Sequence, residues 1–212
     1  MIGNEFTERY GYNGYYFYSG KDITDKMIDK CFEIDKYFFK EDFAYNETRV
    51  REWIKEYGDM CSVLYNPIED KVIAYCFYLF ISDEALELYK QNKISFFTMG
   101  KSLFVNPQNG QSLNLFCLSD ACLPGWDFVQ THKIMNEYYA YMVYELSKKQ
   151  IKIKNVCIDV VCDYDKILAN QFCIENKNNT NHNSLFVWGE FNPNVTWTYC
   201  QYSQRLIEQY KV

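Results

Sequence analysis

One stretch decides the fold: residues 112–144 read SLNLFCLSDACLPGWDFVQTHKIMNEYYAYMVY. The first part of this stretch carries closely spaced bulky apolar side chains, beginning with Leu113 and Leu115, which is the pattern of a buried strand. We therefore expect a strand over 112–122. The turn sequence Leu-Pro-Gly at 123–125 then ends it.

The second part of the stretch predicts a long helix. Apolar side chains recur every four residues, at Ile134, Tyr138, Met142 and Leu146, which gives a helix one wide apolar face. A strand that leads into a helix N-terminus is a place where α/β proteins hold phosphates, because unpaired N–H groups and the positive end of the helix dipole point the same way. An ordinary buried strand and helix without a ligand gives the same pattern, so both interpretations stay open.

Composition and charge restrict the class of protein. The chain has 212 residues, of which 48% are hydrophobic and 19% aromatic, so we expect one folded domain over 1–212. A net charge of -6 disfavours nucleic acid and anionic membranes as the main partners. The sequence shows no signal peptide and no apolar run long enough to cross a bilayer, so a cytoplasmic protein is expected.

The cysteines and histidines argue against disulfides and metals. Nine cysteines are present, none of them in C-x-x-C spacing, and most lie inside apolar runs, which predicts reduced thiols in the core. The only histidines are His132 and His182, and no Cys/His cluster has the spacing of a zinc site. We therefore expect no metal.

Periodicity, capping residues and turn residues predict the other elements. Before the central stretch we expect a strand over 14–18, a helix capped by Asp22 or Thr24, a helix capped by Asn46, a hairpin of strands 61–65 and 72–81, and a short helix over 82–91. After it we expect a strand around 156–160, a helix over 164–175, a polar loop over 176–183, a hairpin of 185–191 with 195–199, and a helix over 201–210.

This order of elements resembles that of the GNAT acyltransferase superfamily over nearly the whole chain. The local likeness lies in KDITDKMIDKCFEIDKYFF at 21–39, ETRVREWIKEYGDMCSVLYN at 47–66, KVIAYCFYLF at 71–80 and VCIDVVCDYDKILANQFC at 156–173. The resemblance implies an α/β fold whose central sheet is mixed and mostly antiparallel, with about six to seven strands flanked by helices.

The resemblance also implies cofactor-binding residues. The family's phosphate loop, Q/R-x-x-G-x-G/A, falls on Gln130, Thr131, His132, Lys133, Ile134 and Met135. Lysine and methionine thus stand where the family has glycines, and side chains there narrow the space for pyrophosphate, although the charge of Lys133 compensates in part. The family's V-x-x-x-N-x-x-A-x-x-x-Y pattern falls on Val161, Asp165, Leu168 and Phe172, of which only the valine is kept.

The activity that the resemblance implies is transfer of an acetyl group from acetyl-CoA to a primary amine of a small molecule or peptide by direct attack. The resemblance then implies that a backbone N–H group at the strand end, which carries Ala121, Cys122 and Leu123, meets the thioester oxygen. Asp120 is the candidate base, because a carboxylate at a partly buried strand end has a raised pKa; the alternative is that it caps the turn. Tyr164 is the candidate acid for the leaving thiolate, because Phe172 replaces the family's tyrosine and has no proton to give.

Two other functions stay open. A GNAT-like domain that has lost the loop glycines and the tyrosine fits a binding module for acyl-CoA or for a protein partner. A hydrolase with a cysteine nucleophile needs a Cys–His pair, and neither histidine has an obvious orienting carboxylate in the sequence. The expected partners are acetyl-CoA and an amine, with no nucleic acid and no membrane; a homodimer stays open.

Overall fold

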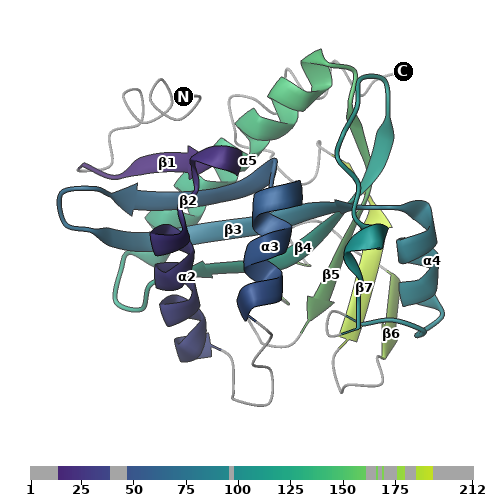
Figure 1. Cartoon of the computed structure of the whole chain (residues 1–212), viewed down its shortest axis with the longest axis horizontal. Helices are drawn as coiled ribbons and strands as arrows, with labels where there is room; N and C mark the ends of the chain where they lie inside the picture. Colours follow the sequence, from purple (N-terminus) through teal and green to yellow (C-terminus); the bar gives the residue numbers. More distant parts are fainter. Residues whose placement is uncertain are drawn as a thin grey trace. The chain divides into compact units, whose positions relative to one another are not determined.

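The computed structural model describes residues 14–38, 47–95, 98–160, 166, 169, 176–179 and 185–192. The chain forms two compact units, and each is described by itself. The first comprises Met1–Tyr78 and Ser119–Met135, and the second comprises Leu79–Leu118 and Asn136–Val212. Strands β3 (Lys71–Ile81) and β4 (Ser112–Cys122) and helix α5 (Phe128–Lys148) each contribute to both units (Figure 1).

The strands of the first unit follow the order β1-β2-β3-β4. Strand β1 (Tyr16–Ser19) pairs antiparallel with β2 (Met60–Asn66), and β2 pairs antiparallel with β3. The hairpin predicted for β2 and β3 is therefore confirmed. Its turn ends at Asp70, whose φ of 52° lies in the left-handed region that aspartate and asparagine tolerate better than most residues.

Two amphipathic helices belong to the same unit, α2 (Asp25–Phe38) and α3 (Glu47–Tyr57). A short 3-10 turn, η1 (Gly20–Asp22), precedes α2. Of the two caps predicted for α2, Thr24 is the one that acts, because its Oγ1 accepts a hydrogen bond of 3.3 Å from the backbone N–H of Met27. Figure 1 shows α2 and α3 next to each other beside β2 and β3.

The strands of the second unit follow the order β4-β5-β7-β6. Strand β5 (Lys152–Val160) runs parallel to β4, and β7 (Leu185–Glu190) pairs antiparallel with β5 and with β6 (Asn176–Asn179). Over both units the sheet is mixed and mostly antiparallel, with seven strands, as the sequence predicted. The short elements α4 (Asp83–Lys90) and η3 (Lys101–Leu103) complete the described part of this unit.

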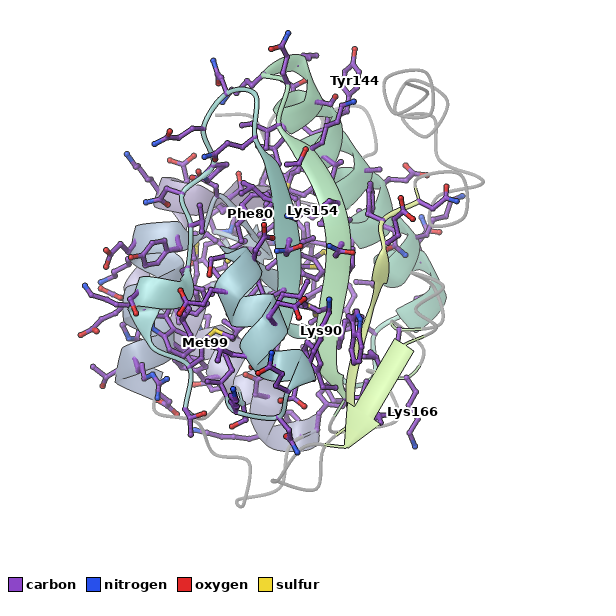
Figure 2. The ribbon with its side chains drawn as sticks, turned by 90° about the vertical axis from the view of Figure 1, so that its right-hand side faces the viewer. Phe80, Lys90, Met99, Tyr144, Lys154 and Lys166 are labelled. Atoms are coloured by element: carbon purple, nitrogen blue, oxygen red, sulfur yellow. The ribbon has the colours of Figure 1, made fainter. Side chains whose placement is uncertain are left out.

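Helix α4 begins where the sequence predicted. The Ser82 hydroxyl accepts a hydrogen bond of 3.1 Å from the backbone N–H of Ala85, which is the N-cap that the prediction required. The carboxylate of Asp83 then accepts from buried Asn114 on β4 at 2.8 Å and pairs with Lys154 on β5. Figure 2 labels Lys154 together with Lys90, which lies at the other end of α4. The start of α4 is thus tied to both strands.

An aromatic stack packs α4 against the sheet at its other end. The rings of Tyr89 on α4 and Phe186 on β7 stack with centres 4.4 Å apart, and Phe186 stacks in turn on Trp188 at 5.5 Å. Phe116 of β4 lies 5.4 Å from Tyr89. Such ring pairs add stability beyond the apolar area that they bury, so this stack helps to hold α4 on the sheet.

The prediction of a polar loop over 176–183 is wrong for its first half, because β6 occupies it. Strand β6 reads Asn-Lys-Asn-Asn and pairs with β7 from Asn176↔Trp188 to Asn179↔Leu185. Its place at the end of the strand order explains how it forms: backbone hydrogen bonds to one neighbour define an edge strand, and polar side chains are tolerated there. The hairpin partner predicted for β7 at 195–199 lies outside the described residues.

Other predicted features also fall outside the described part of the chain. The helix over 164–175 has only Lys166 and Ala169 described, and the closing helix over 201–210 and the Asn46 cap are not described. Among the described cysteines, six are free and buried: Cys31, Cys61, Cys76, Cys117, Cys122 and Cys157. No helix in the described ranges combines the length and apolar character that crossing a bilayer requires.

Asp70 allows a test of the fold by pH. Hydrogen bonds from Lys26 first, then from Tyr65 and Lys30, lower the pKa of Asp70 from 3.8 to about 2. A carboxyl group whose pKa is lower in the folded state adds stability above pH 3.8, and this stability is lost as the pH falls toward 2. Asp70→Asn keeps a residue that accepts the left-handed backbone but removes the charge.

We therefore expect Asp70→Asn to lower the thermal unfolding midpoint at pH 7, and the difference from wild type to shrink as the pH falls from about 4 to about 2. Thermal melts followed by circular dichroism over this range measure it. Glu33→Gln, at an exposed position on α2, is the control for an equal change of net charge. A difference that stays constant over the whole range would show that the ion pairs of Asp70 do not stabilise the hairpin.

Candidate active site

The end of β4 carries the predicted site residues of the first unit. The backbone N–H of Leu123 donates to the carbonyl of Ile73 on β3 at 2.7 Å, so this N–H group is already used within the sheet. In an antiparallel pair successive N–H groups point to opposite edges, so the N–H of Cys122 points to the edge away from β3. The register of β4 with β5 ends at Cys117↔Ile158, and residues 118–122 lie beyond it.

Asp120 is buried at this strand end, with 7% of its surface exposed. Its Oδ2 accepts a hydrogen bond of 3.0 Å from the Tyr78 hydroxyl and one of 3.2 Å from the Cys76 thiol, both on β3. Burial and the negative charge of Asp120 raise the pKa of the neighbouring Cys122 thiol to about 12. The structure therefore holds the Asp120 carboxylate in one orientation, with two donors from β3 on its Oδ2 atom.

A second buried carboxylate, Asp35, was missed by the sequence reasoning. Asp35 lies on α2, and its Oδ1 accepts hydrogen bonds from the Tyr75 hydroxyl and, at 3.3 Å, from Ser119 Oγ. The Tyr75 and Ser119 oxygens are 2.8 Å apart. A signal was present in the sequence: Asp35 stands four residues after Cys31, on the apolar face of the helix, where a charged residue is uncommon unless it has partners.

The start of α5 differs from a glycine-rich phosphate loop. Asp127 caps the helix, because its Oδ1 accepts from the N–H of Gln130 at 3.1 Å and its backbone carbonyl accepts from Thr131 at 2.9 Å. All six residues predicted to form the loop, 130–135, lie in the first two turns of α5. The N–H groups from Thr131 onward belong to the helical ladder, so only those at 127–130 lie ahead of it.

The side chains of the predicted loop point in different directions. Thr131, Ile134 and Met135 are buried, whereas Gln130 and Lys133 are exposed. The structure does not describe the side chain of His132. Of the six, Gln130 and Lys133 are therefore the two described residues whose polar side chains are exposed to solvent.

A cation that the sequence reasoning missed lies beside the turn between β4 and α5. The Lys71 ammonium is 5.0 Å from the centre of the Trp126 ring, within the range of a cation–π interaction. Trp126 also contacts the buried ring of Tyr15 edge-on at 5.2 Å, and the Tyr15 hydroxyl donates to Glu69 at 2.9 Å. These contacts fix the turn and place one positive charge next to it.

Several of the remaining predicted residues lie outside the described part of the chain. Tyr164, Asp165 and Phe172 lie outside the described residues, as do Val161 and Leu168, so their roles stay predictions. Ala121, Cys122 and Leu123 lie at the end of β4, as predicted from sequence. The described ranges contain no group of three or more His, Cys, Asp or Glu side chains placed to hold a metal ion.

Three of the described cysteines are poor nucleophiles. Burial raises the pKa of Cys31, Cys61 and Cys157 well above the usual range for a thiol. Since the thiolate is the nucleophilic form, these residues stay protonated and unreactive at neutral pH. This argues against these three cysteines as the nucleophile of the hydrolase alternative.

Comparison with known proteins gives the class of fold. No family model matches the sequence, and no curated protein matches it significantly. Solved structures do match: the loading GNATL domain of CurA from Lyngbya majuscula has a TM-score of 0.55 at 10% identity and covers 85% of this chain and 98% of its own. NAA60 of Arabidopsis thaliana, in complex with a bisubstrate analogue, has a TM-score of 0.53 at 8% identity. This match covers 83% of this chain and 97% of the NAA60 chain.

A third match, to the NatC complex bound to Gag peptide and CoA, has a TM-score of 0.51 at 6% identity and covers 81% of this chain and 94% of that chain. The chain thus has the GNAT fold, as its order of elements predicted.

The Asp127 cap is open to a direct test. Asp127→Ala removes the oxygen that accepts from Gln130, and we expect the free energy of unfolding to fall by about 1 kcal/mol. Asp127→Ser keeps a capping oxygen without the charge, so its stability should stay close to wild type. Urea denaturation followed by circular dichroism measures both. Equal stability of the alanine and serine variants would show that the cap does not stabilise α5.

Proposed function

We propose that this chain is a divergent member of the GNAT superfamily that transfers an acyl group from an acyl-CoA, in the first place acetyl-CoA, to a primary amine of a small molecule or peptide. The observation that carries the proposal is the buried Asp120 carboxylate, held by Tyr78 and Cys76 on the part of β4 that lies beyond the register with β5. Structures of the same fold contain acetyl-CoA, as in NAA60 of Arabidopsis thaliana, or CoA, as in the NatC complex.

The transfer reaction requires three contributions from the protein. The attacking amine must lose a proton, and Asp120, whose orientation is fixed by Tyr78 and Cys76, is proposed as the base that accepts it. The thioester oxygen gains negative charge as the amine attacks, and the N–H of Cys122, which points to the edge away from β3, is the donor proposed to meet it. The thiolate of CoA then leaves, and Tyr164 is proposed as the acid that protonates it, because Phe172 has no proton to give.

The CoA phosphates are proposed to lie at the start of α5. The N–H groups of 127–130 precede the helical ladder, although that of Gln130 donates to the Asp127 cap, and the side chains of Gln130 and Lys133 are exposed there. Lys71 adds a positive charge beside the turn. The Asp127 carboxylate opposes this attraction, because it brings negative charge to the same helix end. Asp165 and Phe172 are proposed as further residues of the cofactor site.

The Asp127 carboxylate favours a second candidate function, a GNAT-like module that binds an acyl-CoA or a protein partner without turnover. An aspartate at the helix start weakens the site for a pyrophosphate, and no glycine lies within the predicted loop to let the phosphates approach. Such a module would bind CoA in a calorimeter but release no thiol from acetyl-CoA in the presence of amines. Thiol release therefore separates the two candidates.

The role of Asp120 gives the test of the first candidate. We expect the wild-type protein to release CoA thiol from acetyl-CoA when a pool of primary amines is supplied. Asp120→Asn keeps an oxygen for the Tyr78 hydroxyl but removes the base, so kcat should fall about 100- to 10,000-fold, the usual contribution of such a group. Asp29→Asn, which changes an exposed carboxylate on α2, is the control and should leave kcat unchanged.

A thiol-trapping dye follows the reaction, and thermal melts check that the variants fold. Turnover of Asp120→Asn equal to wild type would exclude Asp120 as the base. No thiol release by the wild-type protein with any amine would exclude the transferase and leave the binding module.

A further inference from the structure

The cluster of Asp35, Tyr75 and Ser119 joins three elements of the first unit. Asp35 comes from the end of α2, Tyr75 from β3 and Ser119 from β4, and their exposed fractions are 6%, 0% and 8%. Both hydroxyl groups bond the same carboxylate oxygen, Asp35 Oδ1, and their oxygens lie 2.8 Å from each other. The three polar groups therefore form a triangle of short contacts, in which the two hydroxyl protons make two hydrogen bonds at a time, and no two of the elements make this triangle alone.

Stability alone is a weak reason for such a cluster. Burial of a carboxylate carries a large desolvation cost, and apolar side chains of similar size often give a fold that is at least as stable. Hydrogen bonds differ from apolar contacts in their direction, because they weaken steeply when the angle at the donor departs from a straight line. The triangle therefore fixes the orientation of the Ser119 side chain more sharply than apolar packing would.

Ser119 immediately precedes Asp120, the proposed base. Successive side chains of a strand point to opposite faces, so Asp35 and Tyr75 hold β4 from the α2 side, while Tyr78 and Cys76 hold it from the other side. Ser119 and Asp120 both lie on the part of β4 beyond its register with β5. A rotation of the strand at this place would move the Asp120 carboxylate and the Cys122 N–H together.

We propose that Asp35 is a positioning residue for the transfer reaction: acting through Tyr75 and Ser119, it fixes the segment of β4 that carries Asp120 and Cys122. The inference rests on the proposed function. The inference gives the end of α2 a role in orienting the base. Asp35 on α2 is hydrogen-bonded to Tyr75 and Ser119, and Ser119 is the residue before Asp120.

The kinetic test removes one hydroxyl at a time. Tyr75→Phe and Ser119→Ala change little volume, and we expect each to lower kcat about 10- to 100-fold, as small misplacement of a reacting group does, while KM for acetyl-CoA stays within about 3-fold. Asp35→Asn keeps an oxygen that accepts from both hydroxyls and should retain most of kcat. Asp35→Leu should lose it. Asp29→Asn, on the exposed side of α2, is the matched control.

Amide hydrogen exchange makes the test independent of turnover. The Leu123 amide donates to Ile73 in the folded protein, and we expect it to exchange at least about 10-fold faster in Ser119→Ala and Asp35→Leu, with the amides of β2 unchanged. Wild-type values of both kcat and exchange in Ser119→Ala and Tyr75→Phe overturn the inference. Faster exchange spread evenly over the first unit, with a lower melting temperature and unchanged kcat, makes the cluster merely structural and also overturns it.

The two proposals fail in different ways. If the wild-type protein releases no thiol, the proposed function fails, and the exchange of Leu123 alone then decides whether Asp35 fixes this segment. If the wild-type protein is active but the Ser119 and Tyr75 variants match it in kcat, the transferase stands and the positioning role of Asp35 fails.

Discussion

A carboxylate that is removed from water must receive hydrogen-bond donors from the protein, and this requirement organises the centre of the first unit. Two carboxylates are buried there, Asp35 and Asp120, and β3 supplies donors to both. Tyr75 and Tyr78 are three residues apart, so their side chains point to opposite faces of the sheet and serve one carboxylate each. Strand β3 is thus the element that lets β4 carry a buried acid group.

The start of α5 sets the second constraint on the proposed function, because the CoA phosphates are proposed to bind there without the glycines that usually make room for them. Its own cap, Asp127, brings negative charge, and the cations nearby are Lys133 on the helix and Lys71 against Trp126. A site built from side-chain charges binds phosphates less closely than one built from backbone N–H groups. Under the proposed function we therefore expect CoA to bind weakly, and we expect its affinity to fall strongly as the salt concentration rises.

Much of the fold was predictable because local signals agreed with one another. The bounds of β4, the hairpin of β2 and β3, and the Ser82 cap of α4 follow from apolar patterns and turn residues that act over a few neighbours. Strand β6 was not predictable, since its Asn-Lys-Asn-Asn sequence has no apolar pattern and only pairing with β7 makes it a strand. Such pairing is decided by residues distant in sequence.

The candidate site was predictable only in part. The position of Asp120 near the end of a buried strand was predictable from the apolar pattern, but its partners Tyr78 and Cys76 could not be identified among 20 tyrosines and nine cysteines without the register of β3. Residues 130–135 were expected in a loop, whereas the Asp127 cap starts the helix ahead of them. The cap itself, an aspartate three residues before Gln130, was the signal that would have corrected this.

The central claim is that an acyl-CoA binds where β4 ends and α5 begins. Titration of nitrogen-15-labelled protein with CoA, followed by amide chemical shifts, tests this most directly because it reports every backbone N–H group separately. If acyl-CoA binds there, the amide signals of Cys122 and of residues 127–130 should shift together with one apparent affinity. Shifts confined to other parts of the chain, or none at concentrations that saturate a weak site, would contradict it.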